Sequence, residues 1–145
     1  MTRYSRQISL PEIGEGGQEK LHKARVLIVG AGGLGSPAAL YLGAGVGTIG
    51  LADDDTVGIS NLQRQVLYTE NEVGQLKVHC AAQRLRALNG NIEVHAYPFR
   101  LNRENARRLI ADYDIVVDVC DNFSTRYLIS DSCSALRKPY VYGAI

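Results

Sequence analysis

The sequence contains no tryptophan, one methionine and only three cysteines among its 145 residues. The cysteines are odd in number and form no CxxC pair, which argues against a disulfide framework and presents no readable zinc site. We therefore expect Cys80, Cys120 and Cys133 to be small apolar residues in or near the core.

Long apolar runs are also missing. No run approaches the roughly 18 residues that a membrane span requires. Residues 1–17 lack the apolar core of a secretory signal peptide. We expect a cytoplasmic protein that does not contact a membrane.

The sequence has no excess of charge of one sign. Lys and Arg number 16 against 15 Asp and Glu, a formal charge of +1, which excludes a strongly basic protein that binds nucleic acid. The composition, 46% hydrophobic and 21% charged, is that of an ordinary globular protein. This length is typical of one domain that can bury a core.

Segments typical of strands alternate with segments typical of helices. Strands are expected at 25–29, 47–52, 92–98, 115–119 and 139–144. Helices are expected at 17–24, 36–44, 75–89, 102–111 and 123–136, with Asn102 as an N-cap. The alternation predicts an α/β, Rossmann-like fold, with a largely parallel sheet and helices on both faces.

A glycine-rich loop, GAGGLG, lies between the strand at 25–29 and the helix that follows it. This context is the one that a nucleotide-binding glycine loop requires. Gly30 permits a tight turn, and Gly32 and Gly33 let a phosphate approach the backbone. Gly35 lets the helix pack on the strand. The N-terminus of that helix favours a bound phosphate.

Acidic residues follow two of the expected strands. Asp53 ends the second strand, where a carboxylate can accept hydrogen bonds from ribose hydroxyls, and Asp55 would project to the same side. Asp121 and Asn122 follow the strand at 115–119, where an acid suits a magnesium ion. Asp121 as the N-cap of the next helix is an equally available role. Asp118, inside the strand, can also face the site.

Three cations are candidates to neutralise phosphates: Arg64, Lys77 and, from further away, Arg6. Their number favours ATP chemistry over hydride transfer, since a triphosphate needs several cationic groups and a metal. We expect Arg64 and Lys77 on the solvent side of the site. The alternative for each base, taken alone, is an ordinary solvated surface charge.

The three histidines, His22, His79 and His95, occupy no recognisable constellation and are interpreted as structural or surface residues.

Five sequence blocks resemble the bacterial ThiF/MoeB/HesA family of the ubiquitin-activating enzyme superfamily. They are RYSRQI at 3–8, VLIVGAGGLGSPAALYL at 26–42, GVGTIGLADDDTVGISNLQRQVLY at 45–68, VGQLK at 73–77 and VDVCDNFSTR at 117–126. The resemblance implies a homodimeric enzyme that uses ATP and Mg²⁺. It implies adenylation of the C-terminal glycine carboxylate of a small ubiquitin-like sulfur carrier protein with a Gly-Gly end, with release of pyrophosphate, in thiamine or molybdopterin synthesis.

The resemblance also implies roles for single residues. Gly33 would contact the nucleotide through its backbone, and Asp53 would hold the ribose. Asn61, Arg64 and Lys77 would hold the phosphates. Asp121 would coordinate Mg²⁺, with Asn122 next to the nucleotide, and Arg6 would act on the ATP of a partner subunit. No protein nucleophile is needed, because the attacking carboxylate is already ionised.

The sequence departs from the family pattern at two places. The connection at Gly43–Gly45 is one residue shorter than usual, and glycine there can absorb the change so that Asp53 stays in place. Family members also continue beyond the equivalent of residue 145 with two CxxC pairs for structural zinc. The zinc ligands are thus absent from this chain, and none of its cysteines matches the family's carrier-accepting or sulfur-accepting cysteine.

The expected domain organisation has two parts, and two other functions stay open. We expect a helical segment at 1–24 that carries RYSRQ, and an ATP-binding domain at 25–145 that is incomplete at its C-terminus. Two alternatives stay open: an NAD(P)-dependent oxidoreductase domain, and a catalytically incomplete nucleotide-binding module.

Overall fold

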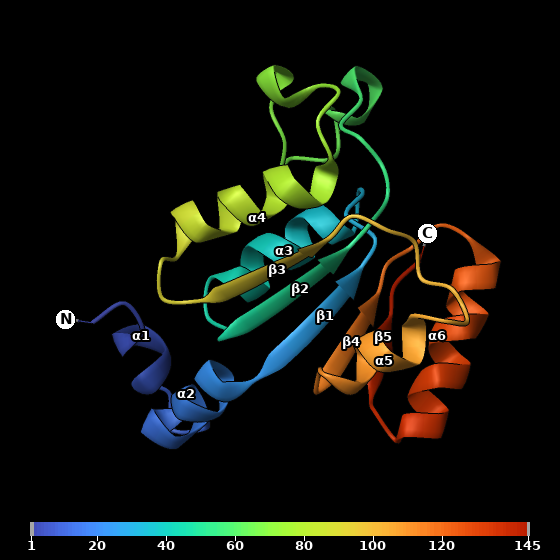
Figure 1. Ribbon diagram of the computed structural model, residues 1–145. Coiled ribbons are helices and arrows are strands. Elements are labelled where there is room, and N and C mark those ends of the chain that lie inside the picture. Colours follow the sequence, from blue (N-terminus) through green and yellow to red (C-terminus); the bar gives the residue numbers. More distant parts are fainter. Residues whose placement is uncertain (1, 145) are drawn as a thin grey trace.

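A computed structural model describes residues 2–144 and contains a five-stranded, entirely parallel sheet in the order β3-β2-β1-β4-β5 (Figure 1). The strands are β1 (Arg25–Val29), β2 (Thr48–Ala52), β3 (Glu93–Tyr97), β4 (Ile115–Asp118) and β5 (Tyr140–Tyr142). The helices are α1 (Ser5–Ile8), α2 (Gly14–Lys23), α3 (Gly35–Gly43), α4 (Lys77–Leu88), α5 (Ala106–Ala111) and α6 (Phe123–Leu136). The predicted Rossmann-like α/β fold is confirmed.

β1 occupies the centre of the sheet, and the chain extends the sheet from it in both directions. Val26 pairs with Ile49 of β2 on one side and with Ile115 of β4 on the other. The connections that leave β1 and β4 therefore diverge to opposite faces. Such a switch point at the carboxyl ends of parallel strands is where nucleotides bind in this class of fold.

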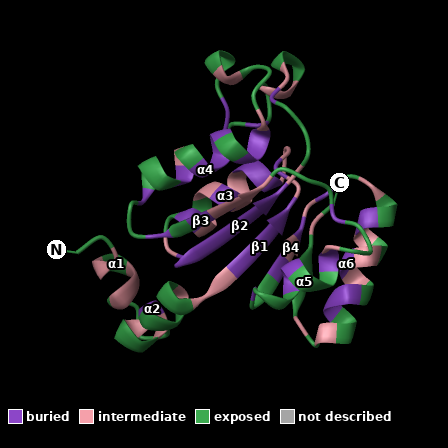
Figure 2. Cartoon of the chain, viewed as in Figure 1, coloured by how far each residue is buried: buried purple, intermediate pink, exposed green. Residues whose placement is uncertain are grey.

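Two apolar cores, one on each face, explain the unbroken apolar sequence of β1. Val26 and Ile28 pack with residues of α3 and α4, whereas Leu27 and Val29 pack with residues of α5 and α6. The inner strands are accordingly the most buried part of the molecule (Figure 2). A strand buried on both faces is expected to be apolar throughout.

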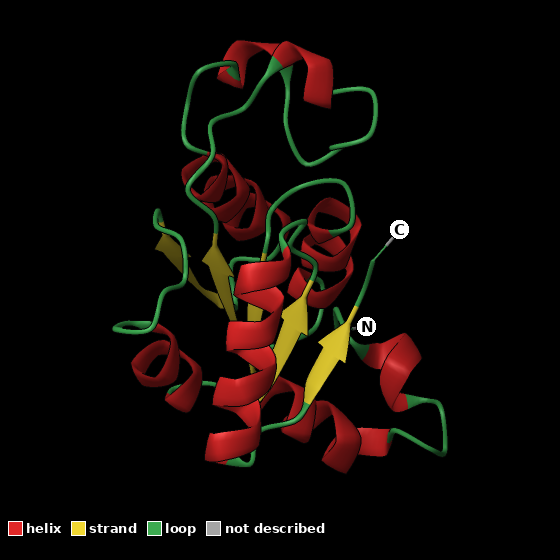
Figure 3. Cartoon of the chain, turned by 90° about the vertical axis from the view of Figure 1, so that its right-hand side faces the viewer, coloured by secondary structure: helices red, strands yellow, loops and turns green. Residues whose placement is uncertain are grey.

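Residues 53–76 leave the sheet after β2 and return to it at α4. They contain two short 3-10 helices, Ile59–Asn61 and Glu70–Glu72, and project beyond the carboxyl ends of the strands (Figure 3). The base of this excursion is closed by backbone hydrogen bonds from Val57 N to Gln75 O and from Gly74 N to Val57 O, each 2.8 Å. The excursion is thus anchored where it begins and ends.

Two predicted helix boundaries were wrong. The helix expected at 17–24 begins at Gly14, and the one expected at 102–111 begins at Ala106. Asn102 is not its N-cap: the Asn102 side chain accepts hydrogen bonds from the N–H groups of Glu104 and Asn105 and forms a local turn. Asparagine favours such turns as strongly as it favours helix caps.

The N-terminal segment contains α1 and α2, which lie near the amino ends of the strands (Figure 1). The domain boundary at residue 25 stays a prediction. No helix within residues 2–144 has the length and apolar character needed to cross a membrane.

Candidate functional site

A cavity of about 640 Å³ opens at the carboxyl ends of the strands, at the switch point between β1 and β4. Its walls include nearly all of the predicted site residues: Gly30, Gly32, Gly33, Asp53, Asp55, Asn61, Arg64, Lys77, Asp121 and Asn122. Residues separated by up to 92 positions in the sequence (30 to 122) thus meet in one place. Their individual roles toward a ligand stay predictions.

The glycine loop needs its glycines for two different steric reasons. Gly30 has a φ of +100°, and a Cβ on it would lie 2.7 Å from the carbonyl oxygen of Val119. A Cβ on Gly35 would lie 2.0 Å from the carbonyl oxygen of Gly30. Gly30 therefore makes the turn, and Gly35 brings the start of α3 against the end of β1.

The loop also presents free hydrogen-bond donors. Within residues 2–144, the backbone N–H groups of Gly32, Gly33 and Leu34 donate to no protein acceptor. They precede α3 at the cavity wall, where the helix dipole adds partial positive charge. Unpaired N–H groups at a helix N-terminus form a ready binding site for a phosphate.

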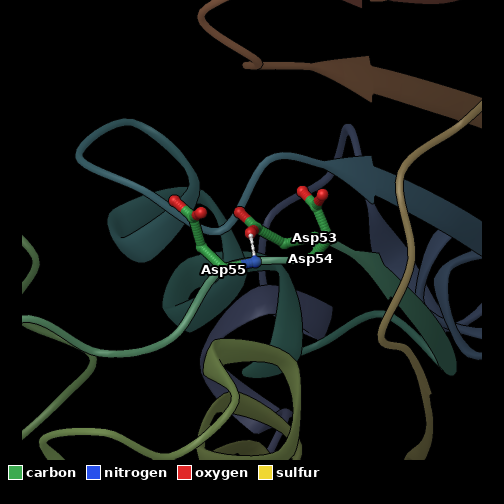
Figure 4. A group of neighbouring side chains, drawn as sticks. All are labelled: Asp53, Asp54 and Asp55. Carbon is green, nitrogen blue, oxygen red and sulfur yellow. Dashed lines mark hydrogen bonds between the residues drawn. The ribbon is translucent and has the colours of Figure 1, made fainter.

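The Asp53 carboxylate fixes the glycine loop. It accepts hydrogen bonds from Ala31 N at 2.7 Å and from Asp55 N at 2.8 Å; the second bond is drawn in Figure 4. A carboxylate can accept about four hydrogen bonds, so roughly two acceptor positions are left for a ligand. Asp53 directly follows β2 and lines the cavity, and its role toward a nucleotide stays a prediction.

The predicted exposure of Lys77 was wrong. Its side chain was expected on the solvent side, yet Lys77 is only 4% exposed. It lies at the start of α4, and its Nζ pairs with the Asp55 carboxylate at 3.0 Å. The backbone oxygen of Asp55 also accepts from the N–H group of Lys77, so Asp55 binds both the backbone and the side chain of Lys77. Burial of the long stem with the charge near the cavity is the usual way that lysine is accommodated.

The three consecutive aspartates lie close enough to hold a cation together, since their ligand oxygens fall within 4.8 Å of one another (Figure 4). Each already has a partner of its own. Asp53 binds backbone N–H groups, Asp54 faces Arg100 at 3.7 Å, and Asp55 pairs with Lys77. The cluster is neutralised by the protein, so we do not interpret it as a metal site.

Arg64 and Asn61 reach the cavity from the excursion. The Arg64 side chain passes over Gly33, at 3.6 Å from the position that a Cβ would take, and donates to Ser60 O at 3.3 Å. The Asn61 side chain accepts from Gly58 N at 3.2 Å. Arg64 therefore lies next to the glycine-loop N–H groups that have no acceptor within residues 2–144.

Asp121 lines the cavity and does not cap α6. Asn122, not Asp121, is the N-cap of α6, because its Oδ1 accepts from Thr125 N at 2.9 Å. The Asp121 carboxylate is exposed at the cavity and has no hydrogen-bond or ion-pair partner within residues 2–144. A carboxylate beside a phosphate cradle is a donor that Mg²⁺ prefers, so the residues present fit this ion.

Asp118 does not face the cavity, contrary to the possibility raised by the sequence. It is fully buried, and its Oδ1 accepts from Cys120 N at 3.2 Å and from Cys120 Sγ at 3.0 Å. Burial, reinforced by the bond to Asp118, raises the pKa of the Cys120 thiol to about 11.

All three cysteines are buried free thiols, as expected. Within residues 2–144, no cysteines and histidines come together as a metal site.

Arg6 is not part of the cavity. It is exposed on α1, which lies near the amino ends of the strands, away from the cavity (Figure 1). His22, His79 and His95 do not line the cavity either. Within one chain the structure does not bring Arg6 to the other predicted residues, so any role for it requires a second molecule.

Three residues in or beside the cavity were not among the predicted site residues. Tyr68 donates from its hydroxyl to Ala31 O at 2.7 Å, and Gln65 is a buried amide whose Oε1 has no partner within the described chain. Arg126 lines the cavity and binds the carbonyl oxygen of Cys120. All three lie inside motifs quoted for the family, SNLQRQVLY and CDNFSTR, but no local pattern distinguishes them from surface residues.

Comparisons with known proteins identify relatives of this chain. The sulfur carrier protein adenylyltransferase of Thermus thermophilus is 53% identical over 146 residues, covering 100% of this chain and 54% of that protein. The adenylyltransferase and sulfurtransferase MOCS3 of Anopheles gambiae is 55% identical over 145 residues, covering 99% of this chain and 33% of that protein. The chain therefore spans about half or less of the length of these curated relatives.

Solved structures share the fold. E. coli tRNA N6-threonylcarbamoyladenosine dehydratase, TcdA, in complex with ATP, superposes with a TM-score of 0.91 at 28% identity, over 97% of this chain and 58% of that one. E. coli MccB with AMPCPP and MccA gives a TM-score of 0.86 at 29% identity, over 99% of this chain and 44% of that one.

The family described as the ThiF family matches residues 4–145, which is nearly the whole sequence. The glycine loop, the acids at the strand ends and the cations of the excursion all fall within this match. The chain belongs to the ThiF family.

Proposed function

We propose that this chain carries the ATP site of an enzyme that adenylates the C-terminal glycine carboxylate of a small ubiquitin-like sulfur carrier protein. The observation that carries the proposal is the cavity itself. It combines the cations Arg64 and Lys77 with glycine-loop N–H groups and an Asp121 carboxylate that have no partner among the described residues.

The chemistry needs what this cavity offers. A carboxylate attacks the α-phosphorus of ATP and pyrophosphate leaves, so two anionic groups must approach each other. Positioning and positive charge are the main demands of such a step. Arg64 and Lys77 supply the charge, and the N–H groups of the glycine loop orient the phosphates.

We assign Asp53 to the ribose and Asp121, with Asn122 beside it, to the metal–phosphate region. When bound, Mg²⁺ would neutralise phosphate charge and orient the leaving group. Asp55 acts through Lys77, because its carboxylate is already paired with that side chain.

The names of the relatives support the substrate class. One is a sulfur carrier protein adenylyltransferase, and another is a probable molybdopterin-synthase adenylyltransferase of Porphyra purpurea. We propose a carrier that ends in Gly-Gly and serves thiamine or molybdopterin synthesis. We further propose that the enzyme is a homodimer in which Arg6 reaches the ATP of the partner subunit.

Pyrophosphate exchange tests the reaction. The protein is incubated with Mg²⁺, ATP, labelled pyrophosphate and a panel of Gly-Gly-ended carriers, and label entering ATP is measured. We expect exchange with at least one carrier and none with the same carrier lacking its last glycine. ATP binding without exchange would instead support a nucleotide-binding module, and selective binding of NAD(P)H would support an oxidoreductase domain.

A further inference from the structure

Arg126 lies in the first turn of α6 and holds the carbonyl group of Cys120. Its Nε donates to Cys120 O at 3.0 Å, and its Nη2 donates to the same oxygen. The guanidinium is a rigid fork, so two donors on one acceptor define the direction of the carbonyl group. The peptide that leads into Asp121 is therefore fixed from the helix side.

The same turn is fixed at its other contacts. Cys120 N donates to the buried Asp118 carboxylate at 3.2 Å, and the Asn122 side chain caps α6. The groups on both sides of Asp121 are thus bound within the protein. The Asp121 carboxylate itself has no partner within residues 2–144. This arrangement orients an acid toward the cavity and leaves its oxygens free.

The Arg126 guanidinium is itself held in place. Its Nη1 donates to the hydroxyl of Tyr142 at 2.7 Å, and its centre lies 4.9 Å from the Tyr142 ring and 5.7 Å from the Phe123 ring. Cation–π contacts of this kind favour one orientation of the side chain. Three of its nitrogens therefore already have protein acceptors, and the side chain is engaged in structure rather than free to contact phosphate.

We propose that Arg126 is a positioning residue that sets the Cys120–Asn122 turn and thereby aims the Asp121 carboxylate at a divalent cation. The inference rests on the proposed function, in which Asp121 holds Mg²⁺. It adds a residue that acts on the metal through the backbone, without touching the metal or the nucleotide. Groups that orient a metal ligand typically change metal affinity by about 10–100-fold when they are removed.

Binding of Mn²⁺ to the complex with AMPCPP tests the inference without relying on turnover. Free Mn²⁺ is followed by electron paramagnetic resonance, because Mn²⁺ takes the same oxygen ligands as Mg²⁺. Affinity for AMPCPP is measured separately without metal. The variants are Arg126→Gln and Asp121→Asn, with Arg108→Gln, an exposed arginine on α5, as the matched control.

We expect Arg126→Gln to weaken Mn²⁺ binding by about tenfold or more, with metal-free AMPCPP affinity unchanged within error. Arg108→Gln should match the wild type in both measurements. An equal loss of metal-free AMPCPP affinity would overturn the inference, because Arg126 would then contact the nucleotide directly. Wild-type Mn²⁺ affinity in folded Arg126→Gln would also overturn it.

Arg126→Lys covers the case in which Arg126→Gln does not fold. Lysine keeps the charge but cannot give two parallel donors to Cys120 O, so intermediate Mn²⁺ affinity is expected. Wild-type affinity in Arg126→Lys would contradict the inference.

Asp121→Asn separates the two proposals. If it removes Mn²⁺ binding while Arg126→Gln does not, only the inference fails. If it leaves Mn²⁺ binding intact, the assignment of Asp121 to the metal fails as well.

Discussion

Residues of the cavity act mostly by holding other groups. Asp53 accepts from the N–H group of Ala31, and Tyr68 donates to its carbonyl oxygen, so the backbone next to Gly32 is fixed on both sides. Asp55 holds the ammonium group of Lys77. A cavity built in this way is arranged before a ligand arrives. Removing one such contact should change either stability or ligand affinity, depending on how deeply the contact is buried.

The Tyr68 hydroxyl should contribute to stability. Tyr68→Phe leaves the carbonyl oxygen of Ala31 without its partner, and an unsatisfied buried group costs about 1–3 kcal/mol. We expect the free energy of unfolding, measured by urea titration, to fall by that amount. Tyr41→Phe is the control, since Tyr41 is 84% exposed and its change should stay within about 0.5 kcal/mol. Equal stability of the two variants would contradict the role of the hydroxyl.

The burial of Lys77 changes how its charge should be tested. Lys77→Ala would remove buried methylenes as well as the charge, so lost activity could reflect unfolding. Lys77→Met keeps most of the stem and removes the ammonium group. We expect ATP affinity, measured by calorimetry, to fall about tenfold or more, as the loss of one charged contact of about 1.5–3 kcal/mol implies.

The melting temperature of Lys77→Met should change little, because Asp55 is 68% exposed and is not stranded in the core. Lys20→Met, on the exposed face of α2, is the matched control for ATP affinity. Unchanged ATP affinity in Lys77→Met would remove Lys77 from the site.

At the scale of elements, the sequence predicted well what depends on local pattern. The strands rich in β-branched residues and the helix at 123–136 were found close to their expected bounds, because apolar periodicity reports burial directly. The start of α5 was missed because Asn102 can form a local turn as readily as a cap. The burial of Lys77 and the hydrogen bonds from Arg126 to the carbonyl oxygen of Cys120 were also missed, because both depend on side-chain contacts that the local sequence pattern does not report.

The junction of β1 and α3 should be highly sensitive to added volume. Gly35→Ala would place a Cβ 2.0 Å from Gly30 O, a backbone atom that cannot move aside. We expect destabilisation well above the roughly 1 kcal/mol of a typical substitution, measured as a drop in the urea midpoint. Gly90→Ala, where a Cβ meets nothing within 4 Å, is the control and should fold normally. A Gly35→Ala protein as stable as wild type would show that the junction is looser than described.

At the scale of the whole molecule, buried thiol and phenol groups should make the free energy of unfolding decrease at alkaline pH. The pKa of Cys120 is raised from 9.0 to about 11, chiefly by burial, and the pKa values of Tyr68 and Tyr113 are raised in the same direction. A group that binds its proton more tightly when folded stabilises the protein below its unfolded pKa. That stability is lost as the pH rises toward the folded value.

We therefore expect the free energy of unfolding, measured under reducing conditions, to fall between about pH 9 and 11, by at most about 1.4 kcal/mol per pH unit for each proton involved. Cys120→Ala should lessen this decline below pH 10, where the tyrosines contribute little and the other two thiols, Cys80 and Cys133, whose pKa values burial also raises, account for the rest. A decline of equal slope in Cys120→Ala would show that the thiol is not responsible.

The proposed dimer is also tested at this scale. Because Arg6 lies away from the cavity of its own chain and is proposed to act on its partner's, Arg6→Ala in one chain and Asp121→Ala in the other should impair the same site of a mixed dimer. In a mixed dimer, one site then keeps both an intact cavity and an intact partner arginine. We expect exchange activity to reappear on mixing the two inactive variants, and not on mixing two batches of one variant. No recovery in a verified mixed dimer would place the role of Arg6 elsewhere.

The central position of β1 also bears on the order of folding. Val26 pairs with Ile49 nearby in the chain but with Ile115 far along it, so the β1–β4 pairing closes by far the longer loop. Contacts between distant segments form slowly, because the loop entropy is lost before they are made. The cavity is complete only after β4 has joined β1. A bound nucleotide should therefore lower the rate of unfolding and leave the rate of refolding unchanged.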